Sequence, residues 1–384
     1  MSTTAAQGFV AAGVTAGIKA SGRPDLALVV NTGPDKVCAA VYTSNRFQAA
    51  PVLWSKGVTA SGVLDAVVLN SGGANACTGA DGLADSKATA QLVASAIGTT
   101  PDRVAVCSTG LIGVRLPMDA ITRGVSIAAE TLDAQGGSDA AQAIMTTDTV
   151  PKTAVESVDG WTVGGMAKGA GMLAPALATM LVVITTDAVL TAAEADAALR
   201  EATRLTFDRT DSDGCMSTND TVILMASGAS GVRPSTEAFT EALTAVCGDL
   251  ASQLLADAEG AAHDIAIHVE NAATEDDALD VARCIARSNL FKCAVFGNDP
   301  NWGRVLAAAG TSKATFDPDA VSVSFNGVEV FTSGGLGADR SLVDLKSSRD
   351  VDVTVDLAAG DAYATVWTND LTYDYVKENA EYSS

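Results

Sequence analysis

Short apolar runs separated by polar turns dominate the hydrophobic pattern of this chain. Such runs are typical of strands buried on both faces, whereas a 3.6-residue period is typical of an amphipathic helix. The pattern predicts strands at residues 26–31, 37–43, 63–70, 104–107, 153–158, 161–166, 179–184, 221–226, 265–269, 290–297, 351–357 and 363–368, and a hairpin within 321–331. It predicts helices at 85–97, 119–131, 191–204, 235–258 and 276–288, with a further helical turn at Pro300. Strands and helices alternate, so we expect a large α/β protein.

Turn and capping residues add local detail to this pattern. Glycine-containing turns predict that the flanking strands pair as hairpins across Thr32–Asp35, Asp159-Gly160, Asn326-Gly327 and Ala358–Asp361. Asp85 is a candidate N-cap, and Thr191 with Glu194 forms a capping box. The polar segment 211–220, with the sequence DSDGCMSTND, is predicted to be a loop before a core strand.

Composition and charge narrow the function classes. The chain has 384 residues, 48% of them hydrophobic and 18% charged, which is typical of a well-packed globular protein. Its formal net charge of −22 argues against nucleic acid and anionic membranes as partners, because both require basic surfaces. The longest apolar stretch, Met172–Ile184, contains Pro175 and is too short to span a bilayer, and the first residues lack a secretory signal pattern. We therefore expect a cytoplasmic protein.

The cysteine and histidine content argues against a metal centre. Seven cysteines occur, an odd number without a close CxxC pair, and most lie in apolar runs. This pattern predicts reduced, buried thiols and neither a disulfide framework nor a zinc site. The two histidines, His263 and His268, are too few for a histidine-rich site or a Ser-His-Asp triad, and we interpret both as structural. No metal or cofactor is expected.

One stretch, Lys168–Leu181, has the most unusual pattern in the chain. Its sequence KGAGMLAPALATML places a glycine-rich lead-in and Pro175 before an apolar strand that Thr179 opens. A threonine commonly begins a strand, so position alone indicates only structure. If the Ala178–Thr179 peptide were broken, however, Thr179 would carry a free α-amine with a pKa of roughly 7.7–8.0 beside its hydroxyl. Such an amine is a suitable general base, and the threonine would then be a nucleophile.

A second segment offers donors for the same chemistry. Ser108-Thr109-Gly110 follows a predicted strand and supplies a hydroxyl and backbone N–H groups at a position where glycine allows close approach. Acyl transfer requires such donors at the developing oxyanion. Turns of this composition are common, so the segment alone is a weak indication.

Motifs along the whole chain resemble those of the ornithine acetyltransferases, also called glutamate N-acetyltransferases. They are GIKASG, SGGANACTG, CSTGLIG, AIMTTDTVPK, WTVGGMAKGAGMLAP, ALATML, STNDT, DAEG, FGNDPNWGRV and the terminal YSS. The resemblance implies a layered α-β-β-α sandwich and self-cleavage between Ala178 and Thr179. It also implies that residues 1–178 form an α chain and residues 179–384 a jointly folded β chain, strand-rich from about 265. Two such pairs would form an α2β2 heterotetramer.

The resemblance also implies an activity and its residues. Thr179 would take acetyl from N-acetylornithine and pass it to glutamate, with Thr109 and Gly110 as the oxyanion hole. The substrate contacts would be Thr146, Lys168, Thr179, Glu259, Asn379 and Ser384. Lys168 suits a substrate carboxylate and Glu259 an ornithine ammonium.

Several alternatives remain open at this point. Thr147 adjoins Thr146, and either side chain is a candidate contact. Acetyl-CoA is a candidate second donor. A self-processing amidohydrolase or aminopeptidase would use water as the acceptor, and an unprocessed relative would only bind amino acids.

Overall fold

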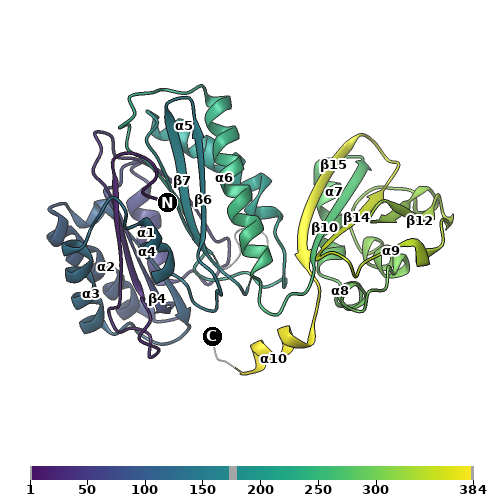
Figure 1. The fold of residues 1–384 in the computed structure, drawn as a ribbon, viewed down its shortest axis with the longest axis horizontal. Helices are drawn as coiled ribbons and strands as arrows, with labels where there is room; N and C mark the ends of the chain where they lie inside the picture. Colours follow the sequence, from purple (N-terminus) through teal and green to yellow (C-terminus); the bar gives the residue numbers. More distant parts are fainter. Residues whose placement is uncertain (1, 173–179, 382–384) are drawn as a thin grey trace.

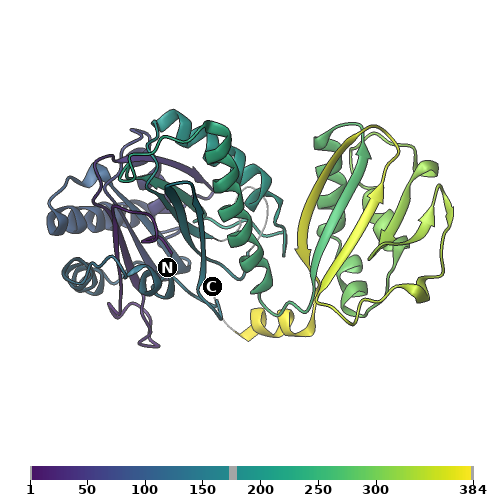
Figure 2. The same ribbon diagram turned by 45° about the horizontal axis from the view of Figure 1, so that its top comes forward.

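The computed structural model describes residues 2–172 and 180–381. The predicted cleavage site, Ala178 and Thr179, and the predicted contact Ser384 therefore lie outside the described residues. The chain forms two lobes, and helix α10 (Tyr373–Glu381) extends from the second lobe towards the first (Figure 1). Figure 2 shows the same arrangement after rotation.

Two sheets form the centre of the first lobe. One has the order β1-β2-β4-β5 and the other the order β3-β9-β8-β7-β6. The first contains β1 (Phe9–Val14), β2 (Leu26–Asn31), β4 (Ala66–Gly73) and β5 (Val104–Leu111). The second contains β3 (Val37–Tyr42), β6 (Lys152–Val158), β7 (Trp161–Lys168), β8 (Leu181–Thr186) and β9 (Thr221–Ala226). Strands β4 and β5 are parallel, as are β8 and β9.

Helices cover the outer faces of the two sheets. The inner faces share a core that joins Leu69 and Cys107 of the first sheet to Val183 and Met225 of the second. Outside the first sheet lie α2 (Gly79–Ile97) and α3 (Met118–Glu130), and outside the second lie α5 (Ala192–Leu205) and α6 (Thr236–Ala256). Helices α1 (Ala50–Thr59) and α4 (Gly137–Ala143) pack against strands of both sheets. The predicted α-β-β-α sandwich is confirmed (Figure 1).

The second lobe is a third sheet with helices on one face. Its order is β13-β12-β11-β14-β10-β15. The strands are β10 (Asp264–Ala272), β11 (Ser322–Phe325), β12 (Val328–Thr332), β13 (Gly335–Leu336), β14 (Asp350–Asp356) and β15 (Ala362–Asn369), and the helices are α7 (Glu275–Ala286), α8 (Asn289–Phe296) and α9 (Trp302–Ala309). Short 3-10 turns occur at Pro101–Arg103, Phe207–Arg209, Pro318–Ala320 and Arg340–Leu342. Across the two described ranges, no helix has the length and apolar character needed to cross a membrane.

Local signals in the sequence predicted local structure well. Asp159-Gly160 joins the antiparallel strands β6 and β7, and Asn326-Gly327 joins β11 and β12. Thr191 accepts a hydrogen bond from the backbone N–H of Glu194, whose side chain reaches back, so the capping box is present. Every residue of β8 is buried, as a continuous apolar run predicts.

Two predicted strand pairings are wrong. Strands β2 and β3 lie in different sheets, where β2 pairs with β1 and β4 while β3 pairs with β9. Strands β14 and β15 are separated by β10, which is parallel to β14 and antiparallel to β15. In both cases the turn residues connect consecutive strands, but each strand pairs with a strand from elsewhere in the chain.

Two other predictions also need correction. The strand predicted at 290–297 is instead helix α8 (Asn289–Phe296). Ser288 caps this helix, which buries Phe291, Ala294 and Val295 on one face. Asp85 does not cap α2 but lies inside it and accepts from Arg115 at 2.7 Å. All seven cysteines are free as predicted, yet only Cys38, Cys107 and Cys247 are buried.

Candidate functional site

The candidate residues converge where strands of the two sheets end at one side of the sandwich. Lys168 is the last residue of β7 and pairs with Leu181 at the start of β8. Thr109 lies near the end of β5, in the other sheet. Lys168 Nζ donates to Thr109 Oγ1 at 3.3 Å, so the two predicted site residues meet across the sandwich.

The ammonium group of Lys168 is buried among charged neighbours. The side chain is 2% exposed. Burial lowers the pKa of Lys168, although the charges of Asp148, Asp220 and Glu259 oppose that change. Burial thus disfavours the charged ammonium, whereas the three nearby carboxylates favour it.

Asp148 is a central residue of the site that the sequence analysis missed. It accepts from Lys152 Nζ at 2.7 Å, from the backbone N–H of Gly169 at 2.7 Å and from that of Thr146 at 2.8 Å. Burial disfavours its charge, but Lys168 and Lys152 outweigh burial and lower the pKa of Asp148 to about 2. The residue stands inside the motif AIMTTDTVPK, so the signal was present in the sequence.

Two features fix the backbone of Ser108–Gly110, the predicted oxyanion segment. Gly110 has φ +127°, and a Cβ there would lie 2.5 Å from the carbonyl carbon of Gly72, so only glycine fits. Asn219 Nδ2 donates to the carbonyl of Ser108 at 2.8 Å, just before the predicted donors. Asn219 is a second neighbour of the predicted site that the sequence analysis did not identify.

The structure distinguishes the two adjacent threonines. Thr147 Oγ1 donates to Glu259 Oε1 at 2.8 Å. Thr146 instead turns towards Asp148, with its hydroxyl 3.4 Å from Oδ2. Glu259 is 7% exposed, and its backbone N–H donates to the carbonyl of Ala170 at 2.9 Å, next to Lys168 in the lead-in. Thr147 is therefore the threonine that contacts a predicted site residue directly.

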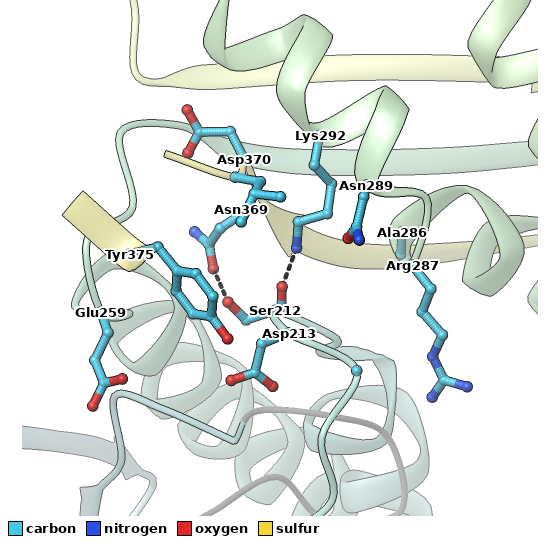
Figure 3. Close-up of a pocket in the computed structure, with 12 residues that line it drawn as sticks. Ser212, Asp213, Glu259, Ala286, Arg287, Asn289, Lys292, Asn369, Asp370 and Tyr375 are labelled. Carbon is cyan, nitrogen blue, oxygen red and sulfur yellow. Dashed lines mark hydrogen bonds between the residues drawn. The ribbon is translucent and has the colours of Figure 1, made fainter. Parts of the chain in front are cut away.

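Two hollows meet at Glu259. One, of about 430 Å³, is lined by Ser212, Asp213, Glu259, Lys292, Asn369 and Tyr375 among others (Figure 3). The other, of about 520 Å³, is lined by Thr147, Asp257, Glu259, Glu378 and Glu381 among others. The second is strongly acidic, which favours a cationic ligand.

Asn379 is the one described candidate that the structure does not bring to the others. It lies on α10 and is exposed, and its Nδ2 donates to the carbonyl of Tyr375 at 3.0 Å within the same helix. Its neighbour Glu378 lines the acidic hollow, so α10 itself reaches the site. The substrate contact predicted for Asn379 stays a prediction.

A family model and full-length relatives of this chain carry the same family name. Residues 10–384 match the model of the ArgJ family. An arginine biosynthesis bifunctional protein ArgJ from Streptomyces coelicolor is 65% identical over 384 residues, with all of both chains covered. A protein of the same name from Thermobifida fusca is 60% identical over the same span. A solved ornithine acetyltransferase complexed with ornithine, from Mycobacterium tuberculosis, is 56% identical and covers 47% of this chain and 96% of its own, with a TM-score of 0.45.

Proposed function

This chain belongs to the ArgJ family, and on that premise we propose that it transfers acetyl from N-acetylornithine to glutamate in arginine biosynthesis. The observation that carries the proposal is the contact between Lys168 Nζ and Thr109 Oγ1 at 3.3 Å. It joins a buried lysine to a hydroxyl that we propose as an oxyanion donor, beside the start of β8. Met180, the residue after Thr179, lies at this same strand end.

Self-cleavage is the first step of the proposed mechanism. Thr179 Oγ attacks the carbonyl carbon of Ala178, a C–O bond forms, and the C–N bond breaks. The hydroxyl proton passes to the departing nitrogen, which becomes the α-amine of Thr179. Water then hydrolyses the ester, leaving a carboxylate on Ala178 and restoring the Thr179 hydroxyl.

Acetyl transfer then uses the new α-amine as the base. Thr179 Oγ attacks the acetyl carbonyl of N-acetylornithine, and its proton passes through the α-amine to the departing nitrogen of ornithine. The acetyl ester on Thr179 is attacked by the amine of glutamate, and the proton returns to Thr179. Thr109 Oγ1 and the N–H of Gly110 would stabilise the oxyanion in both halves of the reaction.

Substrate recognition follows from the charges at the site. Lys168 would bind a carboxylate, and Glu259 beside the acidic hollow would bind the side-chain ammonium of ornithine. Thr147 supports Glu259 from one side. Thr146, Asn379, Thr179 and Ser384 remain the further contacts that the resemblance implies.

The two chains produced by cleavage are proposed to stay together. Strands β8 and β9, which follow residue 179, lie between β3 and β7, which precede it, in one sheet. Separating residues 1–178 from 179–384 would break this sheet and expose its core. We further propose that two such pairs form an α2β2 heterotetramer, as the family resemblance implies.

The word bifunctional in the names of the relatives supports a second donor. We propose that acetyl-CoA also acetylates Thr179, so that the enzyme makes N-acetylglutamate from acetyl-CoA and glutamate. The test supplies each donor separately, with and without glutamate, and measures N-acetylglutamate, free acetate and the mass of the chain beginning at Thr179. Transfer predicts an acetyl adduct and glutamate-dependent product. Acetate released at the same rate without glutamate would indicate an amidohydrolase and contradict the proposal.

A further inference from the structure

The loop at residues 211–220 contacts both ends of the segment that contains the proposed cleavage site. Asp213 Oδ2 accepts from the backbone N–H of Met172 at 2.7 Å. Asp220 Oδ1 accepts from the backbone N–H of Met180 at 3.2 Å. Met172 and Met180 are the described residues directly before and after residues 173–179. Two carboxylates of one ten-residue loop therefore hold the two flanks of the peptide to be broken.

The loop is itself fixed to the second lobe at its beginning. Asp211 Oδ2 accepts from Arg287 Nε at 2.6 Å, and the backbone N–H of Asp211 donates to the carbonyl of Trp367 at 2.8 Å. Ser212 Oγ donates to Asn369 Oδ1 at 2.7 Å, and Lys292 Nζ donates to the carbonyl of Ser212 (Figure 3). These contacts fix the backbone that carries Asp213.

The end of the loop is fixed to the first lobe. Thr43 Oγ1 donates to the carbonyl of Ser217 at 2.7 Å, and the backbone N–H of Thr43 donates to the carbonyl of Asp220. Asn219 donates to the carbonyl of Ser108 at 2.8 Å. One loop thus contacts the oxyanion strand and both flanks of the cleavage segment.

The backbone before the cleavage segment has an unusual conformation. Met172 has φ +53°, a left-handed conformation that side chains other than glycine rarely adopt. Asp148 accepts from the N–H of Gly169, and Glu259 donates its N–H to the carbonyl of Ala170. Together with the bond from Met172 to Asp213, these hydrogen bonds hold the lead-in at Gly169, Ala170 and Met172.

We propose that Asp213 and Asp220 are positioning residues for self-cleavage, which hold Met172 and Met180 on either side of the segment that contains Ala178 and Thr179. The inference rests on the proposed function. Intramolecular attack requires the reacting atoms to lie about 3–3.5 Å apart, and a misplacement of about 1 Å costs on the order of a hundredfold in rate. Fixing both flanks of a short segment removes much of the conformational freedom that would otherwise oppose this approach.

Asp220 acts as a hydrogen-bond acceptor that needs no charge. It is fully buried, and the side chains of Ser217 and Thr43 interact with its carboxyl group. Burial raises the pKa of Asp220 well above its usual range. An asparagine retains the carbonyl oxygen that Met180 requires, so Asp220→Asn should preserve positioning. Both carboxylate oxygens of Asp213 accept hydrogen bonds, one from the backbone N–H of Met172 and one from that of Cys215 at 3.1 Å. Asparagine has only one side-chain oxygen, so it can keep only one of these two bonds.

The matched control is Asp187, at the opposite end of β8. It is also a buried carboxylate that accepts two backbone N–H groups, from Gln7 at 2.9 Å and Thr162 at 2.8 Å. Asp187→Ala therefore creates similar packing and hydrogen-bond losses in the same sheet, away from the cleavage segment. Any effect of general destabilisation should appear equally in this variant.

The experiment follows cleavage of the full chain over time by intact-mass analysis for the wild type, Asp213→Ala, Asp220→Ala, Asp220→Asn and Asp187→Ala. We expect both alanine variants at positions 213 and 220 to cleave at least about tenfold more slowly. Asp220→Asn and Asp187→Ala should cleave at close to the wild-type rate. Thermal melting of each uncut chain shows whether it is folded.

Each other outcome overturns the inference in a distinguishable way. Alanine variants that cleave as fast as the wild type would exclude positioning by these carboxylates. Equal slowing in Asp220→Asn and Asp220→Ala would indicate proton transfer by Asp220 instead, and equal slowing in Asp187→Ala would indicate general destabilisation. Hydroxylamine traps esters, so acceleration of the alanine variants by hydroxylamine would place the block after attack. An uncut wild type would overturn the proposed function together with this inference.

Discussion

The ammonium nitrogen of Lys168 lies 3.3 Å from the hydroxyl oxygen of Thr109, although 59 residues separate them in sequence and they belong to different sheets. A buried cation beside this hydroxyl favours negative charge near both groups. The pair therefore suits a reaction in which an oxyanion develops and a carboxylate substrate is bound nearby. This relationship leads to the first prediction.

Removing the hydroxyl of Thr109 should slow turnover without unfolding the protein. Loss of one oxyanion donor costs about 3 kcal/mol in the barrier, or roughly a hundredfold in rate. Thr109→Ala should show this loss in kcat once cleaved, whereas Thr109→Ser should retain most activity because its hydroxyl remains. Thr185→Ala is a control, since that buried hydroxyl bonds the carbonyl of Thr3 at 2.7 Å. An unchanged kcat in Thr109→Ala would remove Thr109 from the site.

Thr179→Ala should leave the chain intact. Without the hydroxyl no atom of residue 179 can attack the carbonyl of Ala178, so one chain of 38.7 kDa should remain. Intact-mass analysis of the wild type should instead give two chains that divide between Ala178 and Thr179. Efficient cleavage of the alanine variant would contradict the proposed mechanism.

Glu259→Gln should weaken the binding of N-acetylornithine more than the binding of glutamate. The substitution keeps the size of the side chain but removes the charge that would pair with the ornithine ammonium, a loss of about 1–2 kcal/mol or roughly tenfold. The two half-reactions, measured separately, give kcat/KM for the donor and the acceptor. Equal losses would mean that Glu259 contacts a part shared by both substrates, and no loss in either would remove it from the site.

The two adjacent threonines should differ in the same assay. Thr147 Oγ1 donates to Glu259 at 2.8 Å, so Thr147→Val should reduce kcat/KM for N-acetylornithine in the same direction as Glu259→Gln. A lost hydrogen bond to a charged group costs about 1.5–3 kcal/mol. In the double variant the two losses should not add, because both act through one carboxylate. Additive losses would show that Thr147 acts independently.

Stability at acidic pH should depend on Asp148. Its pKa falls from 3.8 unfolded to about 2 folded, so its stabilisation is complete above pH 4 and is lost as the pH falls towards 2. That shift corresponds to about 2 kcal/mol. Denaturant unfolding from pH 5 to pH 2 should show this component in the wild type and not in Asp148→Asn. The variant should also be less stable at neutral pH, because Lys152 loses the more deeply buried of its two carboxylate partners. Parallel pH profiles would contradict the role assigned to Asp148.

The sequence by itself determined the local elements and the family. The hairpin at Asp159-Gly160, the capping box at Thr191 and the buried strand β8 depend on residues close together in the chain, so local pattern is sufficient to predict them. The motifs from residue 10 onwards also identified the family, which the full-length relatives confirm.

Tertiary structure alone decided which strands are neighbours and which polar groups meet. The hydrophobic pattern indicates that a strand is buried, but it does not indicate which strand lies beside it. The position of β10 between β14 and β15 could therefore not be predicted from the sequence. A short apolar run such as residues 290–297 fits a helix as well as a strand, and in the structure the helix buries Phe291 and Val295 in the core of the second lobe. Asp148 and Asp220 both stand in motifs of the sequence, but only folding brings their buried carboxylates close to Lys168, which lies far from Asp220 in the chain.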